Sequence, residues 1–80
     1  MTDALVEKIA AIWAEVLGIG SVDPDDDFLA LGGNSLHAIL IVSRVEELVG
    51  AHLSVRTVLE TRSVREMAEQ VEQAVAEAAP

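Results

Sequence analysis

The sequence predicts an all-α domain: a four-helix bundle of three long helices and one short helix, with a long loop between the first and the second. Three long stretches carry apolar side chains at the spacing of an amphipathic helix, and no part of the chain requires a strand. Capping residues and glycines bound these stretches. The 80 residues form one domain over 1–80. A domain of this size buries only about 60% of its unfolded surface, so its core is small.

The composition excludes several classes of function. The chain has 14 acidic and 5 basic residues and a formal net charge of −9, which argues against nucleic acid as a partner and favours basic protein partners. It has no cysteine, so disulfides and thiolate chemistry are excluded. No apolar run approaches the roughly 20 residues of a membrane span, and Met1-Thr2-Asp3 lacks the basic start of a signal peptide. We therefore expect a cytoplasmic protein.

The first helix is predicted over residues 3–17, and Gly18 or Gly20 ends it. Trp13 lies within its apolar stripe, where a lone tryptophan at helical spacing belongs to the core. The predicted core positions of this helix are Leu5, Ile9, Ile12, Trp13, Val16 and Leu17.

Residues 18–34 show no sustained periodicity and form a long loop, of the kind that is either functional or tightly packed. Its apolar side chains are spaced to hold it against the helices: Val22, Phe28, Leu29 and Leu31. Asp23, Asp25 and Asp27 match the first three ligand positions of an EF-hand. The rest of that pattern fails, because Phe28 stands at the invariant glycine and Asn34 at the bidentate glutamate. We predict no metal site.

A reactive hydroxyl follows this loop. Gly32 and Gly33 allow positive φ and leave no side chain to crowd their neighbours, and Asn34 is a strong helix N-cap. Ser35 then lies on the first turn of the next helix, beside unpaired N–H groups and the positive end of the helix dipole. Such a position suits a phosphate group.

The second helix, over about 35–49, has an apolar face and a second apolar cluster away from it. The core face comprises Ala38, Ile41, Val42, Val45, Leu48 and Val49. Leu36, Ile39 and Leu40 lie off this face, close to Ser35, as expected of a protein-docking patch. The alternative is that loop residues such as Phe28 cover them.

Gly50 ends the second helix. A short third helix is predicted over 55–59 with Ser54 as its cap. Ser63 and Glu66 form a capping-box pattern before the last helix, over 64–78. The inward positions of that helix are Val64, Met67, Ala68, Val71 and Val75.

Gly33-Asn34-Ser35-Leu36 also resembles the Gly-Asp-Ser-Leu signature of a family of serine hydrolases. A nucleophilic serine needs a base and a group that orients the base. His37, two residues along the same helix, points away from Ser35, and no acid follows His52 in a suitable order. We therefore predict no catalytic residues, and expect Ser35 to be modified by another enzyme.

Leu31-Gly32-Gly33-Asn34-Ser35-Leu36, preceded by Asp26-Asp27-Phe28 and followed by an apolar helix, resembles the carrier-protein family. The similarity is greatest to the peptidyl carrier (thiolation) domains of non-ribosomal peptide synthetases. It covers nearly the whole chain, from the helix that contains Trp13 to the Ser63-Val64 start of the last helix.

The resemblance implies a 4′-phosphopantetheine arm on Ser35, transferred from coenzyme A by a phosphopantetheinyl transferase. The thiol of the arm would hold an aminoacyl or peptidyl group as a thioester, in non-ribosomal peptide or related natural-product biosynthesis. Gly33 and Asn34 would frame the attachment site of a monomeric carrier. Adenylation, condensation, thioesterase or tailoring enzymes would contact Leu36, Ile39, Leu40, Val55 and Val58.

Two positions depart from the family pattern. Asn34 replaces the usual Asp or His before the serine, and Arg62 stands where such domains often carry proline. The second helix lacks early acids, which favours a peptidyl over an acyl carrier of polyketide or fatty-acid type. The start at Met1 slightly favours a free-standing carrier over an excised domain. The alternative from another class is an unmodified helical interaction module in which Ser35 only supports the cap.

Overall fold

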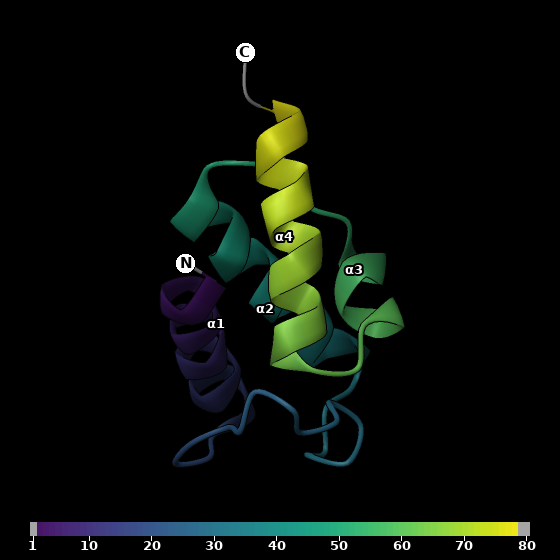
Figure 1. Cartoon of the computed structure of the whole chain (residues 1–80). Helices are drawn as coiled ribbons and strands as arrows, with labels where there is room; N and C mark the ends of the chain where they lie inside the picture. The colour runs from purple at the N-terminus through teal and green to yellow at the C-terminus, as the bar shows by residue number, and fades with distance from the viewer. Residues whose placement is uncertain (1, 79–80) are drawn as a thin grey trace.

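The computed structural model describes residues 2–78, and in this part of the chain it contains helices and no strands. The helices are α1 (Thr2–Leu17), α2 (Ser35–Val49), α3 (Val55–Glu60) and α4 (Val64–Ala78). α1 packs against α2 and α4, and α3 packs against the same two helices. Residues 18–34 cross one end of this bundle, at the bottom of Figure 1. The predicted fold class is confirmed. No helix within 2–78 is both long and apolar enough to cross a membrane.

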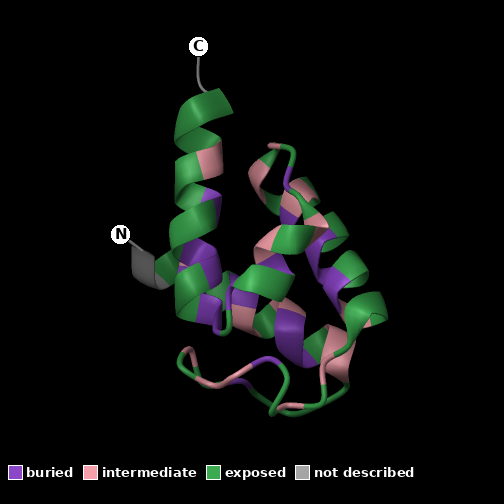
Figure 2. Cartoon of the chain, turned by 90° about the vertical axis from the view of Figure 1, so that its right-hand side faces the viewer, coloured by how far each residue is buried: buried purple, intermediate pink, exposed green. Residues whose placement is uncertain are grey.

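The core lies between the inward faces of the helices and the long loop, as the purple segments of Figure 2 show. Trp13 is fully buried at its centre, as predicted, and its Nε1–H donates to Met67 Sδ at 3.4 Å. The buried apolar residues are Val6, Ile9, Trp13, Ala14, Val22, Phe28, Ala38, Ile41, Val42, Val45, Leu53, Val58, Val64, Met67, Ala68 and Val71.

Two predicted core residues are exposed instead. Leu48 is 41% exposed and Val75 is 38% exposed. Leu48 lies in the last turn of α2, and the C-terminal turns of α4 extend beyond the other helices (Figure 1). These turns have too few neighbours to bury their inward face. Val6, which the prediction did not place in the core, is buried.

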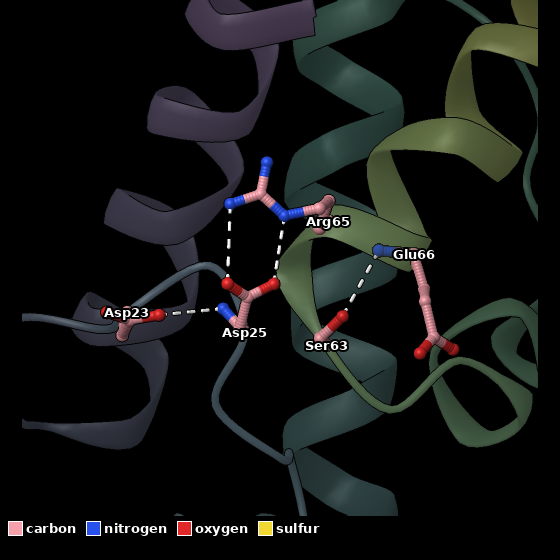
Figure 3. Close-up of polar contacts among 5 residues, drawn as sticks. All are labelled: Asp23, Asp25, Ser63, Arg65 and Glu66. Atoms are coloured by element: carbon pink, nitrogen blue, oxygen red, sulfur yellow. Dashed lines mark hydrogen bonds and ion pairs between the residues drawn. The ribbon is translucent and has the colours of Figure 1, made fainter.

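The helix ends follow the predicted caps with one change. Gly50 takes a left-handed conformation at φ +70°, and Ser54 Oγ accepts the Arg56 N–H. Ser63 Oγ accepts the Glu66 N–H as expected (Figure 3). Glu66 Oε1, however, accepts from the Arg62 N–H, so the return bond of the predicted capping box is displaced by one residue.

An ion pair joins the acidic part of the loop to the start of α4. Arg65 Nε donates to Asp25 Oδ1 at 2.9 Å (Figure 3), and the Arg65 backbone N–H donates to Pro24 O at 3.1 Å. Asp23 Oδ1 accepts the Asp25 N–H, which closes the turn. The hydrogen bond from Arg65 and then its positive charge lower the pKa of Asp25 below its ordinary value of 3.8. Asp25 therefore holds the loop to α4.

Because the folded state lowers the pKa of Asp25, its contribution to stability is present above pH 3.8 and is lost as the pH falls through the lowered pKa. Wild type should exceed Asp25→Asn in free energy of unfolding at about pH 6, and this small, salt-sensitive difference should shrink at an acid pH below 3.8. Denaturant unfolding at both pH values measures it. Glu69→Gln removes the same charge from an exposed position on α4 and serves as the control. A difference that stays constant down to the acid value would contradict the assignment.

Candidate functional site

Ser35 is the first residue of α2 and is exposed at the loop end of the bundle. Asn34 precedes it in an extended conformation (φ −139°, ψ −178°) and caps the helix, as predicted. Its backbone carbonyl accepts the Ala38 N–H at 3.0 Å. The chain therefore turns sharply at Asn34, and this turn presents Ser35 to solvent.

His37 completes the cap, a role that the sequence reasoning missed. Asn34 Oδ1 accepts the His37 N–H at 3.1 Å, and the Asn34 N–H donates to His37 Nδ1 at 3.2 Å. The pair forms a reciprocal capping box with histidine in the place usually held by Glu or Gln. The position of His37, three residues after the N-cap, is the sequence feature that could have predicted this role. Within residues 2–78 no hydrogen bond joins Ser35 Oγ to either histidine.

The two glycines before the cap are required for different structural reasons. Gly32 adopts φ +88°, a left-handed conformation that favours glycine. Gly33 instead lies against the ring of Phe28, where an added Cβ would be only 2.5 Å from Cε1 and Cζ. Gly32 thus supplies the turn, and Gly33 supplies a close approach of backbone to ring.

Phe28 connects the site to the core. It is 2% exposed, and its ring packs edge-on against Trp13 with centroids 5.2 Å apart. Its N–H donates to Arg62 O at 2.7 Å, and its carbonyl accepts the Gly33 N–H at 3.0 Å. The backbone two residues before Ser35 therefore rests on a fixed aromatic side chain.

Three apolar side chains beside Ser35 form what we term the apolar patch: Leu36, Ile39 and Leu40. They are 65%, 50% and 45% exposed, and the buried Phe28 does not cover them. The exposure expected for Ile39 and Leu40 is confirmed, and Leu36, for which the sequence left cover and exposure open, is exposed as well.

The short helix α3 presents different residues from those predicted. Val58 is fully buried and Val55 is half-buried against the core, so Val58 cannot face a partner. Leu59 is exposed instead, and so is Leu29 in the loop. A helix of six residues has too few positions for periodicity to select its outward face. Leu29 was predicted to hold the loop against the helices, and it is exposed instead. No feature of the sequence distinguishes it from the loop residues that are buried.

The electrostatics of the first turn of α2 fit an attached phosphate. The turn contains no acidic residue, although the chain carries a net charge of −9. The N-terminal N–H groups and the helix dipole favour a negative group there. The Ser35 hydroxyl is exposed at this position. The residues present therefore fit a phosphodiester on Ser35 Oγ.

Residues 7–71 match the sequence profile of the phosphopantetheine attachment site family. The chain belongs to this family of carriers, whose members bear covalently attached phosphopantetheine.

Three relatives show which kinds of carrier the chain is similar to. BlmI, a type-II acyl-carrier-protein from Streptomyces verticillus involved in bleomycin biosynthesis, is 60% identical with a TM-score of 0.88, over 90% of this chain and 87% of BlmI. Gramicidin S synthase 2 from Brevibacillus brevis is 39% identical over 66 residues, which is 82% of this chain and only 2% of the length of that synthase. A chain in the structure of the phosphopantetheine transferase Sfp with coenzyme A and a peptidyl carrier protein is 25% identical with a TM-score of 0.80, over 85% of this chain and 88% of that chain. The chain is a phosphopantetheine carrier domain, and it is similar to segments of nonribosomal peptide synthetases, as its resemblance implied.

Gly33→Ala should lower the free energy of unfolding by about 1–3 kcal/mol, the usual cost of overpacking, because the new Cβ would overlap the Phe28 ring. Chemical denaturation measures this loss. Gly20→Ala, where no atom lies within 4 Å of the added Cβ, is the matched control and should be nearly neutral. In a Phe28→Ala background the cost of Gly33→Ala should shrink. An unchanged cost there would show that the ring is not its cause.

Proposed function

We propose that Ser35 Oγ is the attachment point of 4′-phosphopantetheine, and that the chain delivers aminoacyl or peptidyl groups to partner enzymes. The observation that carries this proposal is the exposure of Ser35 at the acid-free first turn of α2, between a rigidly supported backbone and the apolar patch. The match to the phosphopantetheine attachment site family supports it.

In the attachment step, Ser35 Oγ forms a bond to the phosphorus that bears the pantetheine group of coenzyme A. The bond from that phosphorus to the bridging pyrophosphate oxygen breaks, and 3′,5′-ADP leaves. The serine proton passes to a base on the transferase, since within residues 2–78 no histidine is hydrogen-bonded to Ser35 Oγ. When bound, the arm supplies a terminal thiol that holds the cargo as a thioester. Ser35 anchors the arm, and the chain itself performs no catalysis.

The apolar patch gives partner enzymes a surface next to the arm. Leu36, Ile39 and Leu40 expose apolar area beside Ser35 that an enzyme can bury when the arm enters its active site. We assign to it the phosphopantetheinyl transferase and the adenylation, condensation, thioesterase or tailoring enzymes of a cytoplasmic pathway. The solved relative that contains Sfp and coenzyme A supports the first of these.

An acyl cargo is the second candidate, because BlmI is described as an acyl-carrier-protein. The two candidates differ in the loading reaction. Transfer of an amino acid by an adenylating enzyme indicates a peptidyl carrier, and transfer of an acyl group by an acyltransferase indicates an acyl carrier.

Incubation with coenzyme A and a promiscuous phosphopantetheinyl transferase should add one phosphopantetheine to wild type and none to Ser35→Ala. Intact-mass spectrometry measures the addition, and circular dichroism shows that both proteins are folded. Ser43→Ala, at an exposed serine on the same helix, is the control and should be modified as wild type is. A folded wild type that several transferases leave unmodified would favour the unmodified interaction module.

Leu40→Ser should raise the KM for loading of the arm by an adenylating partner by about fivefold or more, as loss of an apolar anchor does. Leu48→Ser is the matched control: both leucines lie on α2 with similar exposure, 45% and 41%, but Leu48 is in the last turn. Its KM should change less than about twofold. Equal effects of the two substitutions would mean that partners do not use the apolar patch.

A further inference from the structure

The cap before Ser35 depends on a titratable side chain. His37 Nδ1 accepts the backbone N–H of Asn34 at 3.2 Å, and Asn34 Oδ1 accepts the N–H of His37 at 3.1 Å. A backbone N–H can only donate, so this hydrogen bond requires a free lone pair on Nδ1, that is, a neutral ring with its proton on Nε2. The usual capping-box residues, Glu and Gln, keep their acceptor at neutral and mildly acidic pH. Histidine loses its acceptor when it is protonated.

Protonation would act on this cap in two ways. It would place the Nδ1–H of His37 against the N–H of Asn34, so that two donors face each other. It would also put a positive charge at the positive end of the α2 dipole. Both effects destabilise the observed arrangement, and both act at Asn34, the N-cap residue that precedes Ser35.

The first turn of α2 holds no acidic residue that could pair with a protonated His37. Most ionisable groups of the loop and of the helices packed against α2 are held in contacts of their own: Glu15 with Arg44, Arg56 with Glu60, Asp25 with Arg65, and Asp23, Asp26 and Asp27 with the backbone N–H groups of Asp25, Asp23 and Ala30. Glu7 and Lys8 of α1 are exposed.

We propose that His37 is a positioning residue for the modification of Ser35: its neutral ring completes the cap that orients the hydroxyl, and its protonation removes the ring's hydrogen bond from that cap. This inference rests on the proposed function of Ser35. Protonation of His37 then makes Ser35 a poorer acceptor of the arm, independently of the transferase.

The cap itself is tested on the unmodified protein by NMR, with no enzyme present. The amide resonance of Asn34 should move in wild type as the pH is lowered from about 8 to about 5. His37→Gln keeps an acceptor that does not titrate, and should abolish this movement. His52→Gln, which removes the other histidine at the far end of α2, should leave it in place. An Asn34 amide that does not respond to pH, or that responds equally in His37→Gln, would overturn the proposal whether or not Ser35 is modified.

The effect on Ser35 is tested by measuring the rate of phosphopantetheine transfer to each variant. Each rate is divided by the rate for His37→Gln at the same pH, because this ratio removes the pH dependence of the transferase itself. The ratio for wild type should be near one at about pH 8 and fall about two- to fivefold at about pH 5.5, as expected for loss of a cap. His52→Gln should follow wild type. His37→Ala should be slow at both pH values, and His37→Gln should rescue it. A wild-type ratio that stays flat or rises on acidification would overturn the proposal, while absence of transfer to every variant at every pH would contradict the proposed function.

Discussion

The contact between Gly33 and the ring of Phe28 is the constraint on which the geometry of the site depends. The ring lies so close that no side chain fits at residue 33, and it is fixed in turn by Trp13 at the centre of the core. Close packing of this kind transmits position with little compliance. The direction in which α2 begins, and hence the place of Ser35, is therefore set by the core rather than by the loop alone.

The distribution of charge separates two parts of the surface. The chain is strongly acidic overall, yet the first turn of α2 has no acid, and apolar side chains surround Ser35 there. Long-range attraction to a basic partner is weakened by salt, whereas burial of apolar area is not. Under the proposed function, a partner is attracted by the acidic surface and held by the apolar patch, and a negatively charged arm on Ser35 is not repelled by neighbouring acids.

The middle of the long loop is held by contacts with the start of α4 and the residues just before it. Phe28 donates to Arg62 O, and Asp25 pairs with Arg65. These contacts join residues that are 34 (Phe28 and Arg62) and 40 (Asp25 and Arg65) positions apart, and they tie the loop to the link between α3 and α4 and to the first turn of α4. Arg62 departs from the proline common in related carriers, but its contact with Phe28 uses only its backbone carbonyl, so this contact does not require a particular side chain.

The amino-acid sequence by itself determined the four helices, most of their caps, the place of Ser35 on the first turn of α2 and the exposure of Ile39 and Leu40. These features depend on residues within a few positions of one another, through helical periodicity and local hydrogen bonds. The tertiary structure decided that Val58 is buried while Leu59 is exposed, that Leu48 and Val75 lie where the bundle has no further layer, and that Gly33 rests on Phe28. Such features depend on which distant segments meet in space, and a pattern along the chain does not contain that information.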